Sequence, residues 1–459
     1  MVESGTAKKR EMAGTLRGLS LRFLGEGGGL CERYRSAGLR ERRSLLDLVL
    51  MKASGIVVFC VSGVLVALAT AVCAAPEKFE RPIRTLELPV RPSNPRNSEG
   101  ALAKLRDGRV ILAYSRYYGT NGNDHGSAVI ALRESRDGGF TWTKEDRTIV
   151  ENEGGMNVMS VSLLRMADGR LALFYLVKNS FEDCRPVMRV STDEGATWGA
   201  PVKCVADADV GYYVLNNDRA VQLKSGRIVL PLCHHDWLPE RKTWDMNGEV
   251  LAALSDAGGA TWRLSRERRK GYDPLGRRIS TQEPGVIELR DGTVLMWIRG
   301  NGGVQYAAYS HDGGESWSRP GPWALHSPVS PATVFRLRNG DLCAVWNDHE
   351  GHPELKRKPG AVEGLRTPLA IAISTDEGRS WSHRKILESN PKGWYCYIAQ
   401  LEMDGYVLLA YCAERGLGHS RVTAVPLAWV YGPDPDPSDP FTFKGAAFDD
   451  LVGGDIDGK

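Results

Sequence analysis

Arginine, carboxylate and tyrosine side chains recur at positions where strands of one fold could bring them together. These residues lie seven to thirteen positions from an expected turn: Arg96, Arg116, Asp124, Glu283, Arg299, Arg366 and Tyr397. A strand rises about 3.3 Å per residue, so they belong at the end of the strands opposite the turns. Each one alone is more often a solvated rim charge or a rim hydrogen bond. Together, arginines that bind carboxylates and a tyrosine near a base favour a site for an acidic ligand.

A repeated eight-residue motif indicates the elements that position these side chains. Its copies are SRDGGFTW (135–142), STDEGATW (191–198), SDAGGATW (255–262), SHDGGESW (310–317) and STDEGRSW (374–381). Apart from the third copy, which has its Asp one place early, they share S-x-D-x-G-x-[ST]-W. Ser and Asp bond to nearby backbone and Gly supplies a positive φ, so each copy predicts a β-turn. We expect each Trp to pack the turn against its own sheet.

A second motif alternates with the first and joins a turn glycine to a following apolar strand. The glycines are Gly108, Gly169, Gly226, Gly292, Gly340 and Gly405. Asp-Gly and Asn-Gly favour two-residue hairpins, and the apolar runs indicate strands buried on both faces. One hairpin of each kind makes a four-stranded antiparallel sheet. The sequence therefore predicts an all-β fold, a six-bladed β-propeller over residues 76–432, in which the strand at 83–90 completes the last blade.

The five Asp motifs resemble the Asp boxes of the sialidase (neuraminidase) superfamily, and the order of motifs is similar over most of 84–432. The resemblance implies three arginines that hold a sugar carboxylate, an Asp acid/base, and a Tyr nucleophile activated by a Glu. By segment it points to Arg96 in NPRNSEG, Asp124 in DHGSAVIALRESRDGG, Glu283 and Arg299 in EPGVIELRDGTVLMWIRG, Arg366 in RTPLAIAISTDEG, and Tyr397 in YIAQLEMDGYVLLAYC.

Departures from the family pattern bear on the substrate. Asn-Ser-Glu follows Arg96 where the family has Ile-Pro, and Ile398 follows Tyr397 where the family has Ser. Segments 151–164 and 216–219 are similar to those of bacterial sialidase-like proteins. The residues that could also line the pocket are Arg116, Asn157, Asn217, Asp218, Arg219, His234 and Tyr395, the last an alternative tyrosine on the same strand face.

The resemblance implies an exo-α-sialidase-like retaining glycoside hydrolase that removes terminal sialic acid. A neutral phenol can approach an anomeric carbon that bears a carboxylate without like-charge repulsion, and sialidases with a Tyr nucleophile are a known exception among glycosidases. Glu283 would take the phenol proton, and Asp124 would protonate the leaving oxygen. Two alternatives stay open: a glycosidase for another acidic sugar, and a non-catalytic glycan-binding propeller.

Composition excludes several other classes. The chain has 59 basic and 56 acidic residues and a net charge of +3, so no large basic excess favours a nucleic-acid partner. An apolar content of 42% argues against a disordered or multi-span membrane protein. The cluster of His234, His235 and Asp236 has no third ligand at helical or hairpin spacing, so we expect no metal and no cofactor. The expected partners are sialylated or other acidic-sugar glycans.

The amino-terminal region has the layout of a targeting segment. Residues 51–75 combine a Lys, an apolar run at 56–72 and small residues before a Pro, which predicts a secretory signal peptide. Residues 1–50 are interpreted as a disordered leader or a mis-assigned start, and 433–459 as a C-terminal tail. We expect a secreted or periplasmic protein. If 56–72 is not cleaved, it would serve as a membrane anchor.

Six of the nine cysteines follow this leader, without the spacing of a disulfide scaffold. Cys396 and Cys412 lie about equally far from one expected hairpin turn. A cross-strand disulfide and two buried thiols are both compatible with that spacing.

Overall fold

The computed structural model describes residues 79–350, 365–414 and 418–433. The predicted leader and signal peptide, and nearly all of the predicted tail, lie outside these ranges. Within them the regular structure is β-strand, apart from a 3₁₀ turn (Asp207–Asp209) and the short helix α2 (Leu427–Tyr431). No helix of this described part is long and apolar enough to cross a membrane.

Four separate antiparallel sheets each contain four strands. The first is β2 (Asn97–Lys104), β3 (Val110–Tyr117), β4 (Ala128–Ser135) and β5 (Arg147–Val150). The next is β17 (Thr281–Glu288), β18 (Val294–Gly300), β19 (Val304–Ser310) and β20 (Gly321–His326). It is followed by β21 (Thr333–Arg336), β22 (Leu342–Asn347), β23 (Leu369–Ser374) and β24 (Ser382–Glu388). The last is β25 (Cys396–Glu402), β26 (Tyr406–Ala413), β27 (His419–Pro426) and β1 (Ile83–Leu88).

The chain between the first two of these sheets forms one nine-stranded sheet. Its strands are β6 (Asn157–Arg165), β7 (Leu171–Lys178), β8 (Cys184–Ser191), β9 (Val202–Lys203), β10 (Tyr212–Val214), β11 (Val221–Gln222), β12 (Ile228–His235), β15 (Glu249–Ser255) and β16 (Arg263–Leu264). A separate hairpin consists of β13 (Trp237–Leu238) and β14 (Thr243–Trp244). Because β10 pairs with both β8 and β12, this region is continuous, and the predicted count of six separate blades is not confirmed.

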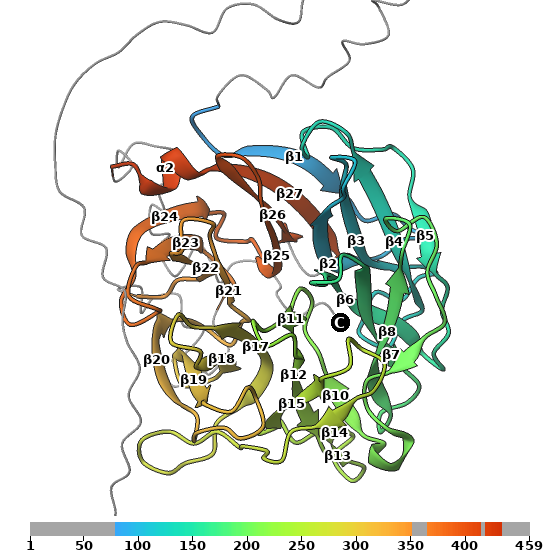
Figure 1. Ribbon diagram of the computed structural model, residues 1–459, viewed down its shortest axis with the longest axis vertical. Coiled ribbons are helices and arrows are strands. Elements are labelled where there is room, and N and C mark those ends of the chain that lie inside the picture. The colour runs from blue at the N-terminus through green and yellow to red at the C-terminus, as the bar shows by residue number, and fades with distance from the viewer. Residues whose placement is uncertain (1–78, 351–364, 415–417, 434–459) are drawn as a thin grey trace, which may run out of the picture. The chain divides into compact units, whose positions relative to one another are not determined.

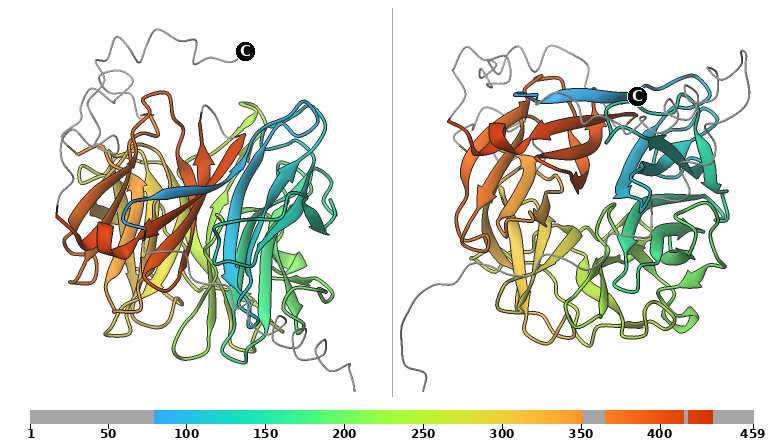
Figure 2. Two further views of the ribbon diagram at one scale, coloured as in Figure 1. Left: turned by 90° about the horizontal axis from the view of Figure 1, so that it is seen from above. Right: turned by 45° about the horizontal axis from the view of Figure 1, so that its top comes forward.

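The sheets are arranged around a central axis in chain order, as in a β-propeller (Figure 1). Two further views show the sheets standing side by side, each with its faces toward its neighbours (Figure 2). The hydrophobic clusters accordingly combine residues of successive sheets, for example Leu112 of β3 with Leu408 of β26. This arrangement explains the continuous apolar runs, since both faces of a strand are buried.

The predicted closing strand is confirmed. β1 pairs antiparallel with β27, so residues from the start of the described chain form the outer edge of the sheet made by β25 to β27. Ion pairs of the buried Arg421 support this seam, because Arg421 of β27 contacts the exposed Glu87 of β1 at 2.7 Å and the buried Glu388 of β24 at 2.6 Å. The ring is thus joined by strand pairing between distant segments of the chain.

The Asp motifs form the predicted turns. In the first copy, Asp137 accepts hydrogen bonds from the backbone N–H and the hydroxyl of Thr141 at 2.8 and 2.6 Å, and the Ser135 hydroxyl accepts one from the backbone N–H of Gly139. In the third copy, Gly259 still donates to Ser255, whereas Asp256 forms ion pairs with Arg227 and Arg263. Moving the Asp by one place therefore removes its turn bonds but keeps those of Ser.

The motif tryptophans also contact strands that precede their own hairpin along the chain, which extends the expectation that each packs its turn against its own sheet. Trp262 contacts Phe174 of β7 edge-on at 6.0 Å, and Trp381 contacts Trp323 of β20 at 5.8 Å. Trp317 is 2% exposed in a cluster with residues of β12 and β15. A large aromatic ring buries more apolar surface in the crevice between two sheets than on one sheet.

Candidate active site

The innermost strands of three sheets and of the nine-stranded sheet carry the same irregularity. In β2, β6, β17 and β25, the strand advances by three residues while its partner strand advances by two. Each of these strands therefore contains a β-bulge with one extra residue. A residue with positive φ stands in each bulge: Glu99 (53°), Ser160 (59°), Glu283 (43°) and Tyr397 (58°). Non-glycine residues seldom adopt this conformation, and such positions concentrate at functional sites.

Small residues make room for two of these bulges. A Cβ on Gly100 would lie 2.9 Å from the carbonyl oxygen of Ala113, and one on Gly285 would lie 2.1 Å from the Trp297 ring. The strand that follows each bulge must therefore approach its neighbour closely. This explains the glycines in NSEG and EPG without reference to chemistry.

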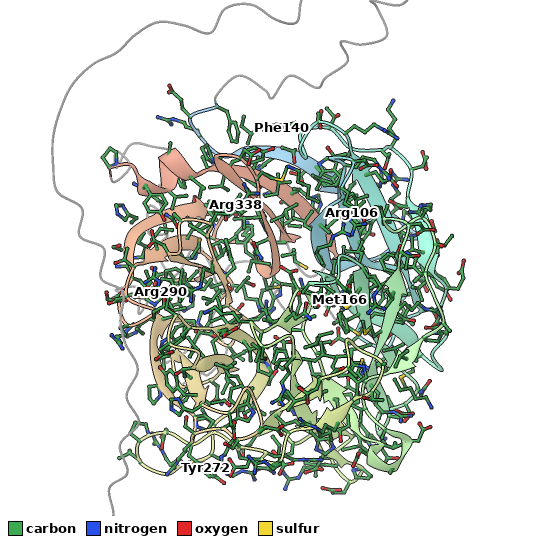
Figure 3. The ribbon with its side chains drawn as sticks, viewed as in Figure 1. Arg106, Phe140, Met166, Tyr272, Arg290 and Arg338 are labelled. Atoms are coloured by element: carbon green, nitrogen blue, oxygen red, sulfur yellow. The ribbon has the colours of Figure 1, made fainter. Side chains whose placement is uncertain are left out.

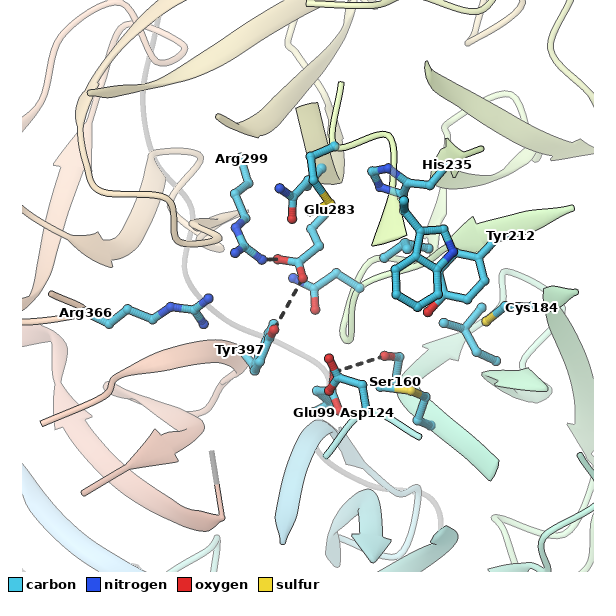
Figure 4. A pocket seen from close by; sticks show the side chains of 17 residues that line it. Glu99, Asp124, Ser160, Cys184, Tyr212, His235, Glu283, Arg299, Arg366 and Tyr397 are labelled. Atoms are coloured by element: carbon cyan, nitrogen blue, oxygen red, sulfur yellow. Dashed lines mark hydrogen bonds and ion pairs between the residues drawn. The ribbon is translucent and has the colours of Figure 1, made fainter. Parts of the chain in front are cut away.

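All four bulge residues line one cavity of about 320 Å³ near the propeller axis (Figure 4). Its charged and hydroxyl-bearing wall consists of Glu99, Asp124, Ser160, Glu283, Arg299, Arg366 and Tyr397. The opposite wall is more apolar and includes Met159, Leu176, Tyr212, Trp244 and Met246. The cavity thus has a polar half that can bind charged groups and an aromatic half that can cover an apolar part of a ligand.

Tyr397 and Glu283 lie within hydrogen-bond reach of each other. The Tyr397 hydroxyl donates to Glu283 Oε1 at 3.3 Å, and Arg299 Nη1 lies 2.8 Å from Glu283 Oε2. Burial, followed by the Glu283 carboxylate, raises the pKa of Tyr397 well above its ordinary value. The phenol is therefore neutral and lies within hydrogen-bond reach of a carboxylate that could accept its proton.

Arg366 is a buried cation with unused donors. It is 6% exposed, and its Nε and Nη1 atoms have no hydrogen-bond partner in the described structure. The guanidinium stacks over the Trp394 ring at 4.8 Å and lies 5.6 Å from the centre of the Tyr397 ring. A buried guanidinium with unpartnered donors is suited to charge-assisted hydrogen bonds with a carboxylate.

Arg96 lies behind the cavity wall and its donors are already used. Its Nε donates to Ser98 at 2.8 Å, Nη2 to Glu99 at 3.0 Å and Nη1 to Asp124 at 2.5 Å. The side chain is 1% exposed and packs over the Tyr117 ring. The structure thus brings Arg299 and Arg366 into the cavity, whereas Arg96 reaches it through its carboxylate partners.

Asp124 lies in the connection between β3 and β4 and faces the cavity. Its backbone carbonyl accepts hydrogen bonds from Asn157 Nδ2 at 3.1 Å and Lys178 Nζ at 2.9 Å, which fix this connection. Burial raises the pKa of Asp124. The Arg96 guanidinium and other nearby cations lower it by more than this, so the net shift of the pKa is downward. Asn157, predicted as a pocket residue, lies outside the cavity lining and acts on this connection instead.

Glu99 and Ser160 are cavity residues that the sequence reasoning missed. Glu99 Oε2 accepts hydrogen bonds from Arg96 and from Ser98 at 2.9 Å, and Oε1 accepts a long one from Ser160 at 3.4 Å. Burial raises the pKa of Glu99, and the charge of Asp124 adds to the rise, while Arg96 opposes it. The departure from the family pattern after Arg96 was the signal that could have identified Glu99.

The segment 216–219 makes hydrogen bonds to strands of several sheets. Asn217 donates to the carbonyl oxygens of Gly100 at 2.7 Å and Tyr397 at 3.0 Å. Asp218 accepts from the backbone N–H of Gln400 at 2.9 Å, and Arg219 donates to the carbonyl of Ala332 at 2.7 Å. These residues connect strands of different sheets. Asn216 lines the cavity, whereas the predicted pocket residues Asn217, Asp218 and Arg219 do not.

Three further predicted pocket residues point elsewhere. Arg116 lies on β3, the second strand of its sheet, with Nε 3.9 Å from Asp146. Tyr395 is buried in an apolar cluster and contacts the Tyr411 ring at 6.4 Å. Alternation along β12 turns His235 into the cavity and places His234 against the Tyr213 ring. Corrections of this kind follow from strand order and pleat, which a single sequence motif does not reveal.

Cys396 and Cys412 stand directly opposite each other on β25 and β26, both buried and not joined by a disulfide. Among the described residues, no group of three or more His, Cys, Asp or Glu side chains could hold a metal ion.

Known proteins resemble this chain in both sequence and fold. A sialidase of Bacteroides fragilis (strain YCH46) is 23% identical over 363 residues, covering 71% of this chain and 61% of the relative. A sialidase of Micromonospora viridifaciens is 25% identical over 366 residues, covering 72% and 52%. The chain thus spans a little over half the length of these curated relatives. The structure of the Hadza microbial sialidase Hz136 has a TM-score of 0.57 at 18% identity and covers 72% of this chain and 66% of that one, which shows a shared fold.

The family model for the BNR repeat-like domain matches residues 116–409, which is more than half of the chain. This range includes all five Asp motifs and the cavity residues from Asp124 to Tyr397. The match agrees with the turn geometry, the ring of antiparallel sheets and the curated relatives. The chain therefore belongs to the BNR repeat-like domain family and is a sialidase-like BNR-repeat protein.

Proposed function

We propose that this protein is an exo-α-sialidase-like retaining glycoside hydrolase that releases a terminal sialic acid, or a closely similar acidic sugar, from glycoconjugates. The observation that carries the proposal is the hydrogen bond from Tyr397 to Glu283 in a cavity that also holds Arg299 and Arg366. A neutral phenol, its base and two cations thus face one space of about 320 Å³.

The nucleophile in this proposal is Tyr397. Its phenol is neutral because of burial and the Glu283 charge, so it can approach an anomeric carbon that carries a carboxylate without like-charge repulsion. Glu283 accepts the phenol proton while the bond to the sugar forms. Water then displaces the tyrosine, and two inversions give retention of configuration.

The substrate carboxylate in this proposal is bound by Arg366 and Arg299. Both guanidiniums line the cavity, and Arg366 Nε and Nη1 and Arg299 Nε have no hydrogen-bond partner in the described residues. An ionised acceptor at such donors forms charge-assisted hydrogen bonds, which are about twice as strong as neutral ones. Arg96 contributes its charge from behind the wall through Glu99 and Asp124.

The residues that follow Arg96 affect which acidic sugar the cavity would accept. Asn97, Ser98 and Glu99 replace the Ile-Pro of the family pattern, and Glu99 adds a carboxyl group to the cavity wall. That observation favours a second candidate, a glycosidase for another acidic sugar. Both candidates require the substrate carboxylate and the Tyr397–Glu283 pair.

The proposal is tested with a panel of aryl glycosides of sialic acid, other 2-keto acid sugars, uronates and neutral sugars. We expect cleavage of at least one acidic glycoside with retained configuration, observed by NMR of the first-formed product. Tyr397→Phe should abolish hydrolysis and keep binding of the acidic sugar. Failure of the wild-type protein to cleave every acidic glycoside would overturn the hydrolase proposal and leave a binding protein.

The proposal includes a ring of six blades. The strands β6 to β9 carry one turn glycine and one Asp motif, and so do β11, β12, β15 and β16. Each group repeats the two-hairpin pattern of the four separate sheets. In this interpretation the short strand β10 joins two blades without adding one.

A further inference from the structure

Glu99 is a carboxyl group in the cavity to which neither the sequence motifs nor the proposed function gives a role. We infer that Glu99 is a catalytic residue, the group that protonates the departing glycosidic oxygen and later takes a proton from the attacking water. This inference rests on the hydrolase proposed above. It assigns to Glu99 the step that the family resemblance assigns to Asp124.

The backbone places Glu99 in the same way as the proposed nucleophile and its base. Glu99, Glu283 and Tyr397 each stand in the bulge of an innermost strand with positive φ, and all three face the cavity (Figure 4). Asp124, in contrast, lies on a connection between two strands. Paired residues of the sheet lie on both sides of the bulge and hold its backbone in place. The side chain in the bulge is therefore kept in a fixed position, which proton transfer requires.

The two oxygens of Glu99 have different surroundings. Oε2 accepts hydrogen bonds from Arg96 at 3.0 Å and Ser98 at 2.9 Å, both of which are buried. Oε1 has a single contact, the Ser160 hydroxyl at 3.4 Å, which is long for a hydrogen bond between oxygens. Oε1 is therefore the oxygen that can carry a proton toward a bound substrate.

The surroundings shift the pKa values of Glu99 and Asp124, the two carboxyl groups of this wall, in opposite directions. Burial is the largest cause that raises the pKa of Glu99, and the charges of Asp124 and Glu283 act in the same direction. Arg96 opposes this rise for Glu99 and lowers the pKa of Asp124 overall. Two carboxyl groups with opposite shifts in one site are the usual sign of separate acid and anion roles. The opposite directions of the two pKa shifts favour Glu99 over Asp124 as the proton donor of this wall.

Cleavage of the glycosidic bond in this scheme needs no reactant other than the glycoside and water. As the Tyr397 oxygen forms its bond to the anomeric carbon, Glu283 takes the phenol proton, the glycosidic C–O bond breaks, and Glu99 gives its proton to the departing oxygen. An alcohol leaves. Water then attacks the anomeric carbon, the bond to Tyr397 breaks, Glu283 returns the proton to the phenolate oxygen, and Glu99 takes the proton of the water. The enzyme regains its starting protonation.

The experiment compares Glu99→Gln with Asp124→Asn on aryl glycosides of the cleaved sugar that differ in the acidity of the leaving phenol. A poor leaving group needs a proton from the enzyme and a good one does not. We therefore expect Glu99→Gln to lower kcat/KM by about 10²–10³-fold for the least acidic phenol and by less than about tenfold for the most acidic one. Azide, a nucleophile that needs no base, should restore turnover of Glu99→Gln on the activated substrate as a glycosyl azide.

Two variants serve as comparisons. Asp124→Asn should lower activity by a similar factor on every phenol, because it perturbs Arg96 and the cavity charge without removing the proton donor. Glu145→Gln changes an exposed carboxylate in the β4–β5 connection and should match the wild type throughout. A steep dependence on the phenol in Asp124→Asn, with a flat one in Glu99→Gln, would overturn the inference and keep the hydrolase.

A measurement without substrate separates the two proposals. Infrared difference spectra of the wild-type protein and Glu99→Gln, recorded as a pH titration, should show a protonated carboxyl band from Glu99 that persists to higher pH than that of an ordinary Glu. Absence of that band would overturn the inference whatever the protein cleaves. If the band is present but no acidic glycoside is cleaved, the hydrolase proposal fails, and the catalytic role of Glu99 fails with it.

Discussion

The two ends of the strands use the same sheets in different ways. At the Asp-motif end, four of the five motifs repeat one set of side-chain bonds, for example Asp376 with the hydroxyl of Ser380 at 2.6 Å. Turn residues also repeat a contact with the following sheet. The backbone N–H groups of Arg106, Arg290 and Arg338 each donate to a glutamate there; Figure 3 labels these three arginines. At the cavity end the backbone repeats its bulge, but the side chain differs each time.

This difference separates stability from chemistry. Where both backbone and side chains repeat, every copy performs the same structural task, and the loss of one copy costs one turn. Where only the backbone repeats, each copy presents a different group to a shared space, and the loss of one group removes a function that no other copy supplies. Substitutions at the two ends should therefore affect different measurements.

The largest effect is expected at Glu283. Glu283→Gln keeps the shape of the bulge residue but removes the base that accepts the Tyr397 proton at 3.3 Å. We expect kcat on the cleaved glycoside to fall by about 10²–10⁴-fold. Asp193→Asn, a change in an Asp motif at the other end, is the control and should keep kcat. A loss of less than tenfold in Glu283→Gln would contradict the proposed role.

Arg366 tests whether the cavity is selective for carboxylates. Arg366→Ala removes two buried, unpartnered donors, so we expect the affinity for the acidic sugar to fall by about 10–100-fold. Arg366→Lys keeps the charge but loses the planar guanidinium, so its affinity for the acidic sugar should lie between those of the wild type and Arg366→Ala. Calorimetric titration measures both. Equal affinity of the wild type and Arg366→Ala would show that the ligand carboxylate binds elsewhere.

Sequence patterns predicted the repeated end better than the cavity end. Turn glycines and Asp motifs located the hairpins because a tight turn requires particular residues, and the closing strand followed from the missing partner of the last sheet. The nine-stranded sheet was not predicted, since β10 has three residues and no turn signal of its own. A strand this short is defined by its two neighbours, which only the fold brings together.

At the cavity, the sequence indicated which side chains gather there better than it indicated their contacts. The resemblance pointed to Asp124, Glu283, Arg299, Arg366 and Tyr397, and all five line the cavity. The sequence did not show that the Arg96 guanidinium donates to Ser98, Glu99 and Asp124. The contact with Glu99 depends on the positive φ of that residue. The positive-φ residue of these two bulges is a glutamate and a serine rather than a glycine, so neither Glu99 nor Ser160 was identified.

Asp218, between the two ends, should make stability depend on pH. Burial raises its pKa to about 7. The folded state then binds a proton that the unfolded state releases near pH 4, so this contribution to stability is complete below about pH 4 and is lost as the pH rises to about 7. Asp218→Asn keeps an acceptor for the Gln400 N–H and has no such loss. The upper bound of the difference is about 4 kcal/mol, since each pKa unit corresponds to about 1.4 kcal/mol.

Urea unfolding at several pH values measures this difference. We expect the free energy of unfolding of Asp218→Asn to exceed that of the wild type at pH 8 by about 2 kcal/mol, and the gap to close toward pH 4. Parallel curves for the two proteins over this range would show that Asp218 is ionised when folded.

The smallest effects are expected at the Asp motifs, where the third copy provides an internal comparison. Asp376→Ala removes bonds to Ser374, Arg379 and Ser380, so we expect a loss of about 1–2 kcal/mol in the free energy of unfolding. Asp256→Ala removes exposed ion pairs with Arg227 and Arg263, which contribute about 0–1 kcal/mol.

Salt distinguishes the two cases further. The effect of Asp256→Ala should shrink in about 1 M sodium chloride, where exposed charges are screened, and that of Asp376→Ala should persist because most of its bonds are to backbone and hydroxyl groups. Both variants should keep the kcat of the wild type, since neither residue lies near the cavity lining. A fall in kcat without a fall in stability would show that the Asp-motif end communicates with the site, and the separation of the two ends would then be wrong.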